Sequence, residues 1–213
     1  MKNNTPLNFW NQVWQDGTIR FHQNVFNSQM VSKFRDVDLN GKTVLIPLAG
    51  KTRDILFFLE KGAQVTAVEF VEQAIIEFFE NNEIQYTKIG NLYQCENLKF
   101  YAMDFFAFTT EKKFDVLFDR ASQVVFAPAE RPYYYQHMST LIDTHTMLLL
   151  GAIEHTGPAD FGPPHKISQA EVKNAYEKMG ITLKKFSEQQ DTTNEKLQAM
   201  GVNVMTSYYL TNQ

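Results

Sequence analysis

The chain constrains its own fold most strongly between residues 43 and 70, where an apolar strand, a tight turn, a helix and a second strand follow one another. The pieces are the apolar run 44–46, the break 47–50, the helical run 55–59 and the apolar run 65–68. Gly62 ends the helical run, as glycine commonly does at a helix C-terminus. A β-branched strand, a glycine turn, a helix and a second strand are typical of a parallel βαβ unit.

A carboxylate ends the second strand of this unit. Glu69 stands 19 residues after Gly50. In a parallel βαβ unit this spacing places the acid at the carboxyl end of its strand, beside the first turn, where it can accept hydrogen bonds from two ribose hydroxyls. The alternative is an ordinary βαβ unit in which Glu69 is a solvated strand end. We predict a nucleoside-binding site.

The turn itself restricts which nucleoside can bind. A dinucleotide site needs three glycines in the pattern G-x-G-x-x-G, so that a pyrophosphate can approach backbone N–H groups. Here Pro47 and Leu48 occupy that region. A phosphate-binding P-loop is excluded as well, because Leu45 stands where its first glycine would be. A nicotinamide-dependent oxidoreductase is therefore disfavoured. A cofactor with a ribose and no phosphate fits better, and S-adenosylmethionine is the common one.

Composition favours one soluble domain over residues 1–213. The chain has a mass of 24.7 kDa and a hydrophobic fraction of 44%, which is enough for a full core. Its net charge of -4 argues against nucleic acid as a principal partner. The single cysteine, Cys95, cannot form an internal disulfide, and no run suits a signal peptide or a membrane span. We expect a cytoplasmic protein with no membrane partner and no bound metal.

Strands and helices alternate along the rest of the chain, with further strands at 98–103, 114–118 and 146–153 and helices at 72–82, 128–142 and 168–179. This order predicts a Rossmann-like, doubly wound and mostly parallel α/β sheet, closed by an antiparallel strand pair at 181–186 and 204–210. The segment around Cys95 is read as a polar connection. Ligands bind such sheets at the carboxyl ends of the strands. The residues expected there are Leu48 to Gly50, Glu69, Asp104 with Phe105, and Asp119 with Arg120.

Motifs spread over the whole chain resemble those of the thiopurine S-methyltransferase family. The matching pieces are Phe9-Trp10 with Trp14, Phe21-His22-Gln23, the turn 44–54, Val68-Glu69, Asp104-Phe105-Phe106, Asp119-Arg120-Ala121, Gly162-Pro163-Pro164 and Tyr208-Tyr209-Leu210. The resemblance implies a class I methyltransferase fold, S-adenosylmethionine as methyl donor, S-adenosylhomocysteine as product and a small acceptor, usually sulfur. It also implies donor contacts at Trp14, Leu48, Glu69 and Arg120.

Roles can be assigned to the residues of the donor site. Glu69 accepts the ribose hydroxyls, while Leu48 and Gly50 let main-chain groups approach the donor. Asp104 accepts from the adenine amino group and Phe105 packs near the ring. Two further contacts complete the set. Arg120 pairs with the methionine carboxylate or orients the acceptor, and Trp14, which rests on the resemblance alone, faces the sulfonium.

The acceptor is less well defined than the donor. Residues 153–156 read Ile-Glu-His-Thr, where relatives tend to carry an aromatic residue followed by an acid. A thiol is partly ionised near neutral pH and needs no strong base, so Arg120 is the expected catalytic group, acting by orientation. His22 and His155 are candidate bases for a hydroxyl or amine acceptor, or else structural residues. The alternatives are a non-catalytic S-adenosylmethionine-binding regulator, or transfer to oxygen, nitrogen, a selenium or tellurium species, or halide.

The N-terminal segment, about residues 1–35, is expected to form a helical cover over the site. Trp10 and Trp14 lie four residues apart, which places both rings on one face of a helix. A face with two tryptophans must be buried, and the open strand ends of the sheet offer an apolar surface. We expect a monomer that closes this lid over donor and acceptor, excluding water.

Overall fold

A computed structural model describes the chain at Gln12, Trp14 and Asp16 and over residues 23–120, 122–158 and 160–212. The chain divides into two compact units, Met1–Val116 and Leu117–Gln213, and each is described by itself. The expectation of a single domain over residues 1–213 stays a prediction.

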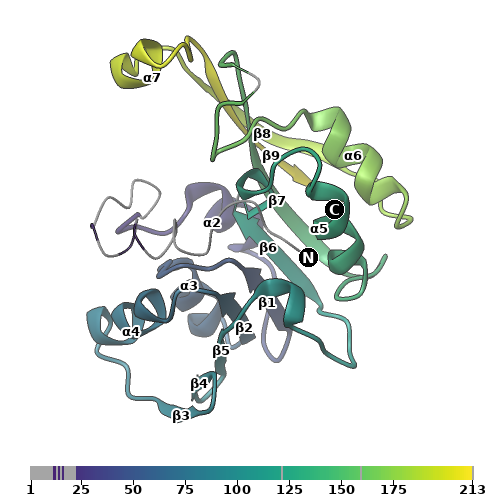
Figure 1. The fold of residues 1–213 in the computed structure, drawn as a ribbon. Coiled ribbons are helices and arrows are strands. Elements are labelled where there is room, and N and C mark those ends of the chain that lie inside the picture. Colours follow the sequence, from purple (N-terminus) through teal and green to yellow (C-terminus); the bar gives the residue numbers. More distant parts are fainter. Residues whose placement is uncertain are drawn as a thin grey trace. The chain divides into compact units, whose positions relative to one another are not determined.

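The first unit alternates strands and helices as the sequence predicts. In chain order its elements are α2 (Ser28–Phe34), β1 (Thr43–Pro47), α3 (Asp54–Glu60), β2 (Gln64–Glu69), α4 (Glu72–Asn81), β3 (Thr87–Ile89), β4 (Leu92–Cys95), β5 (Leu98–Ala102) and the short 3-10 helix η1 (Phe105–Ala107). Figure 1 shows α3 and α4 lying beside the strands. Asn27 caps α2 by accepting from the Gln29 and Met30 N–H groups.

Three strands of this unit run parallel, in the order β5-β2-β1. Pro47 of β1 lies opposite Val68 of β2, and Glu69 lies opposite Ala102 of β5. Their carboxyl ends therefore meet at one edge. Strand β1 is buried at every position after Thr43, which explains its continuous apolar sequence.

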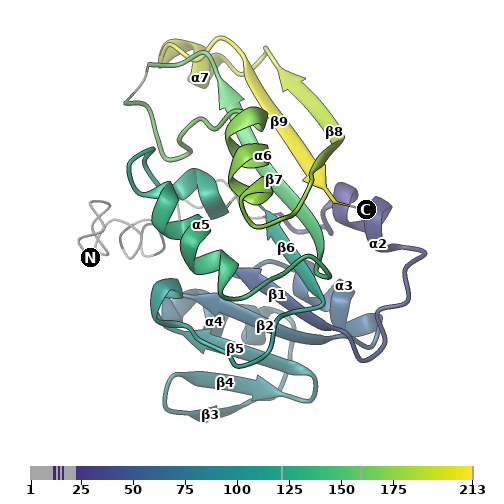
Figure 2. The same cartoon turned by 90° about the vertical axis from the view of Figure 1, so that its right-hand side faces the viewer.

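The connection around Cys95 is not a loop, and that part of the sequence reading was wrong. Strands β3 and β4 form an antiparallel hairpin, and β4 pairs antiparallel with β5 (Figure 2). All three residues of β3 are exposed, so no apolar alternation marks it in the sequence. Gly90, with φ of +59°, supplies the left-handed backbone of the turn. The sheet of this unit is accordingly mixed.

The second unit contains β6 (Val116–Arg120, which begins at the unit boundary), the 3-10 helix η2 (Ser122–Val125), α5 (Arg131–Ser139), β7 (Met147–His155), α6 (Gln169–Glu177), β8 (Lys184–Asp191), α7 (Glu195–Ala199) and β9 (Met205–Thr211). Its strand order is β6-β7-β9-β8. Strand β9 pairs antiparallel with both β7 and β8, which confirms the predicted terminal strand pair (Figure 2).

Two helix predictions in this unit need correction. Helix α5 begins at Arg131 and not at Pro128, because the Glu130 N–H bonds the Ala127 carbonyl and the Glu130 carboxylate accepts from the Ala127 N–H. These bonds form a turn before the helix. Helix α7 was not predicted. It is five residues long and none of its residues is buried, so it has no apolar stripe to reveal it.

Asp119, on β6, is a buried structural carboxylate. One of its oxygens accepts from the Tyr134 hydroxyl at 2.6 Å, and the other accepts from the Ser122 N–H at 2.6 Å. It thereby joins β6, η2 and α5. Burial raises the pKa of Asp119, and the two hydrogen bonds oppose that shift. The sequence analysis grouped Asp119 with the strand-end residues expected to face a ligand. In the structure both of its carboxylate oxygens accept hydrogen bonds from other parts of the same unit.

We expect Asp119→Asn to lower the free energy of unfolding by about 1–3 kcal/mol, because asparagine has one acceptor oxygen for two buried donors. Denaturant unfolding of both proteins measures the difference. Asp36→Asn is the matched control, since Asp36 is exposed beside Arg35. An unchanged midpoint in Asp119→Asn would show that its hydrogen bonds contribute nothing.

Candidate active site

The Glu69 carboxylate lies at the edge of the sheet where β1 and β2 end, and it accepts hydrogen bonds from two segments of the chain. Its Oε2 accepts from the Gly50 N–H at 2.8 Å, and its Oε1 accepts from the Val71 N–H at 2.8 Å. The Glu69 carbonyl also accepts from the Met103 N–H, just past β5. The turn after β1, the start of α4 and the end of β5 are thus joined through one residue, at the place the spacing predicted.

The turn that contacts Glu69 has an unusual backbone. Leu48 has φ of +46° and Gly50 has φ of +55°. The left-handed region is free for glycine but costs a leucine roughly 1–2 kcal/mol. Such strain is typical of functional sites. The Ala49 N–H donates to the Val68 carbonyl at 3.0 Å, which holds the turn against β2.

The carboxylate is suited to a partner that donates hydrogen bonds. Burial raises the pKa of Glu69, and the N–H groups of Val71, Gly50 and Phe70 oppose the shift. The Gly50 N–H donates to one carboxylate oxygen and the Val71 N–H to the other, and an ionised carboxylate has about four lone-pair sites in all. Two ribose hydroxyls would donate to the carboxylate and stabilise the ionised form. The residues present therefore fit a ribose.

Asp104 and Phe105 follow β5 at the same edge. Asp104 is exposed and caps η1, with Oδ1 accepting from the Phe106 N–H at 3.0 Å, while Phe105 is buried. Among the described residues, only the Phe106 N–H is seen to donate to the Asp104 carboxylate, which leaves its other oxygen able to accept from an amino group. The adenine contacts expected of these two residues stay predictions.

Trp14 lies against the start of α4. Its ring is 5% exposed and packs with Val71 and Ala74. The Lys51 Nζ lies 5.6 Å from the ring centroid and pairs with the Glu77 carboxylate at 2.6 Å. Lys51 thus connects the turn, the tryptophan and α4. Sequence reasoning missed this role, although Lys51 directly follows Gly50.

The other predicted site residues lie in the second unit or outside the described residues. Arg120 is the half-buried last residue of β6, and His155 is the buried last residue of β7, so both lie in the second unit. His22 lies outside the described residues, as does most of the segment expected to form a lid. The structure therefore brings together Leu48, Gly50, Glu69, Asp104 and Phe105, with Trp14 beside them.

Solved structures with this fold bind the predicted donor. The chain resembles the 1,6-didemethyltoxoflavin-N1-methyltransferase of Burkholderia thailandensis with bound S-adenosylhomocysteine (TM-score 0.62, 16% identity, 97% of this chain and 87% of that one). It also resembles the magnesium protoporphyrin IX methyltransferase of Synechocystis PCC 6803 with bound S-adenosylmethionine (TM-score 0.64, 14% identity, 97% and 94%). The fold is that of class I methyltransferases, and the chain is an S-adenosylmethionine-dependent methyltransferase.

Sequence relatives define the family. The family model described as Thiopurine S-methyltransferase (TPMT) matches residues 5–212. The thiopurine S-methyltransferase of Francisella tularensis subsp. novicida is 32% identical over 95% of this chain and 92% of its own length. That of Legionella pneumophila (strain Paris) is 28% identical over 94% of each. The chain belongs to the thiopurine S-methyltransferase family, as its motifs predicted.

The raised pKa of Glu69 predicts that the affinity for S-adenosylhomocysteine depends on pH. Hydrogen bonds from ribose hydroxyls favour the ionised carboxylate, so the pKa of Glu69 is lower in the complex than in the free protein. Affinity for S-adenosylhomocysteine should therefore be constant above the raised pKa and fall as the pH drops through it. Calorimetry between pH 8 and pH 5 measures this. Glu69→Gln should bind more weakly and lose the pH dependence, whereas a flat profile in the unaltered protein would contradict it.

Proposed function

We propose that this protein transfers the methyl group of S-adenosylmethionine to the sulfur of a small thiol or thiopurine-like acceptor. The Glu69 carboxylate carries the donor half of the proposal, because it is buried at the strand ends and fixed by the N–H groups of Gly50 and Val71. Family membership supports the sulfur acceptor, since the relatives from Legionella pneumophila and Francisella tularensis are named thiopurine S-methyltransferases.

The residues around the donor have distinct roles in this proposal. Glu69 accepts the ribose hydroxyls, and the left-handed turn at Leu48 and Gly50 lets backbone approach the donor. Asp104 and Phe105 bind the adenine by a hydrogen bond and by packing. Trp14 faces the sulfonium. Arg120 orients a carboxylate, either that of the methionine moiety or one on the acceptor.

The chemistry needs alignment more than acid–base catalysis. S-adenosylmethionine supplies a methyl group attached to a positively charged sulfur. A lone pair of the acceptor sulfur forms the new S–C bond while the old bond breaks, and the thiol proton goes to solvent. Alignment of the reacting atoms lowers the barrier by several kcal/mol. Because a thiol ionises near neutral pH, the protein need not supply a base.

His155 is poorly suited to act as a base in its present form. Its Nδ1 accepts from the Gly157 N–H at 3.1 Å, so in the neutral ring the proton lies on Nε2. A residue that donates at Nε2 orients a partner and does not accept its proton. This observation favours an acceptor that needs no base over an alcohol or amine, and we keep His22 and His155 as secondary candidates.

Matched acceptors separate the remaining possibilities. A set of thiol, alcohol, amine, selenol and halide acceptors, followed by formation of S-adenosylhomocysteine, identifies the nucleophile. Donor binding without product from any acceptor would instead favour a regulatory protein that binds S-adenosylmethionine.

The proposal also covers the location of the protein, its partners and its N-terminal segment. None of the helices formed by the described residues is long and apolar enough to cross a membrane. We propose a cytoplasmic monomer that acts on small molecules and not on nucleic acid. The segment 1–35 is proposed to close over the bound donor, and hydrogen exchange with and without S-adenosylhomocysteine tests this.

Glu69→Ala should weaken the binding of S-adenosylhomocysteine by about 1.5–3 kcal/mol, the scale of hydrogen bonds to a charged group. Calorimetry measures the loss. Glu72→Ala is the matched control, because Glu72 lies on α4 and pairs with Lys88 at 2.7 Å. It should leave the affinity unchanged. Equal affinity in Glu69→Ala and the unaltered protein would remove Glu69 from the site.

Arg120→Met should lower the rate of methyl transfer at least about tenfold, or about 1.4 kcal/mol in the barrier, and change the melting temperature by only a few degrees. The physical reason is the loss of a guanidinium that orients a carboxylate. Initial rates and thermal unfolding provide the two measurements. Arg35→Met, at an exposed position, is the control. Normal specific activity combined with a large loss of stability would assign Arg120 a structural role.

A further inference from the structure

A lysine lies beside the site proposed for a positively charged donor. Lys51 directly follows Gly50, whose N–H donates to the Glu69 carboxylate at 2.8 Å. The Lys51 ammonium lies 5.6 Å from the centroid of the Trp14 ring, the residue proposed above to face the sulfonium. Two positive charges repel each other most where water is excluded. An ammonium without a counter-charge at this position would therefore weaken the binding of S-adenosylmethionine.

Helix α4 supplies a carboxylate that offsets this charge. The Lys51 Nζ pairs with the Glu77 Oε2 at 2.6 Å. The other Glu77 oxygen accepts from the Gln73 Nε2 at 3.2 Å, about one helical turn earlier on α4. Both carboxylate oxygens are thus held, and the ion pair has a fixed place against the turn that follows β1. Together its two members present little net charge to a ligand.

This ion pair is shielded from water more than the others of its unit. The side chains of Lys51 and Glu77 are 16% and 26% exposed, whereas those of Lys88 and Glu72 are 47% and 48% exposed. Solvent and salt screen an exposed pair, so its effect on a nearby ligand is small. A partly buried pair is screened much less. Removal of one partner there leaves a charge that acts on its surroundings.

Trp14 connects the ion pair to the donor site. Its ring is 5% exposed and packs with Val71 and Ala74 at the start of α4. The Val71 N–H donates to the Glu69 Oε1 at 2.8 Å, so a residue that packs with the ring also holds the carboxylate. An aromatic ring attracts cations, and Lys51 already lies over this one. A sulfonium at Trp14 would share the ring with the ammonium, and pairing with Glu77 relieves the repulsion between them.

We propose that the Lys51–Glu77 pair sets the preference of the donor site between S-adenosylmethionine and S-adenosylhomocysteine. The inference rests on the donor site proposed above, in which Trp14 faces the sulfonium. The two ligands differ only in the methyl group and in the positive charge on sulfur. Glu77 offsets the Lys51 charge and so preserves the affinity for the cationic donor. A site that bound the neutral product far more tightly would be inhibited by its own product, so the pair favours turnover.

Calorimetry with each ligand, without an acceptor, measures this preference as the ratio of the dissociation constant of the donor to that of the product. Glu77→Gln keeps an oxygen for Lys51 and loses the charge, so the ratio should rise at least about threefold. Lys51→Met leaves the Glu77 carboxylate without its counter-charge, so the ratio should fall at least about threefold. A change in packing alone weakens both ligands and cancels in the ratio.

Three further variants separate charge from structure. The double variant Lys51→Met/Glu77→Gln is neutral again and should restore the ratio of the unaltered protein, even where both affinities are lower. Lys51→Arg keeps the positive charge and should leave the ratio unchanged. Lys42→Met is the matched control, because Lys42 pairs with Asp115 at 3.6 Å beside the start of β1, at the end of the strand opposite the donor site. It should also leave the ratio unchanged.

Equal weakening of both ligands in Glu77→Gln and Lys51→Met would overturn the inference and give the pair a structural role alone. Glu77→Gln has nearly the shape of the unaltered protein, so it decides the question even where Lys51→Met loses stability, and melting temperatures confirm folding. Failure of the donor site itself has a different signature. In that case Glu69→Ala leaves the affinity for both ligands unchanged, and the inference fails together with the site.

Discussion

The Glu69 carboxylate is the interaction on which the donor site depends. Two backbone N–H groups from segments 19 residues and two residues away along the chain converge on it. Each donor fixes one oxygen, so the carboxylate stands in a set orientation at the edge where β1 and β2 end. Its burial has an electrostatic cost that raises its pKa. Hydroxyl donors of a ribose would offset that cost, which links the geometry of the turn to the recognition of a nucleoside.

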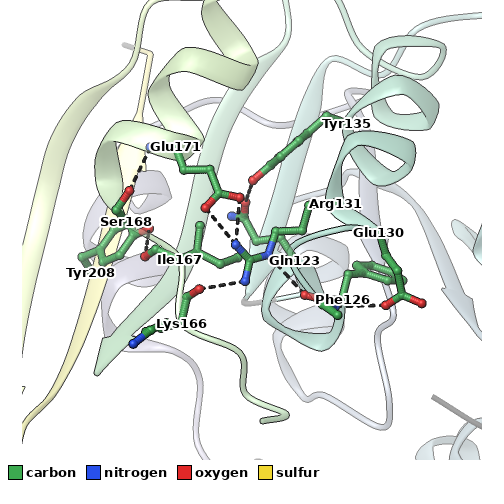
Figure 3. Close-up of polar contacts among 11 residues, drawn as sticks. Gln123, Phe126, Glu130, Arg131, Tyr135, Lys166, Ile167, Ser168, Glu171 and Tyr208 are labelled. Atoms are coloured by element: carbon green, nitrogen blue, oxygen red, sulfur yellow. Dashed lines mark hydrogen bonds and ion pairs between the residues drawn. The ribbon is translucent and has the colours of Figure 1, made fainter. Parts of the chain in front are cut away.

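The second unit contains buried charged side chains whose hydrogen bonds hold its elements together. Asp119 accepts from Tyr134 and Ser122, and Arg131 bonds Glu171 and two carbonyls (Figure 3). Each group is satisfied by several partners, as burial of a charge requires.

The sequence predicted elements whose apolar pattern is strong. The strands now seen as β1, β2 and β7 lie close to their predicted ranges. The spacing of Gly50 and Glu69 correctly placed the carboxylate beside the first turn, where it accepts from the Gly50 N–H. Elements without a buried face were missed. Strand β3 is exposed throughout and α7 buries no residue, so neither leaves a periodic signal. The start of α5 was misplaced because the Glu130 side chain forms a turn that propensity alone does not reveal.

The sequence by itself determined the alternation of strands and helices, the carboxylate at the end of β2 and the family motifs. These depend on local periodicity and on fixed spacing within one βαβ unit. The tertiary structure alone decided which charges pair and which stay open. Arg131 meets Glu171 across 40 residues, and the Gly157 N–H selects the tautomer of His155. Such facts depend on the direction of side chains from different elements, and a linear pattern carries no information about that direction.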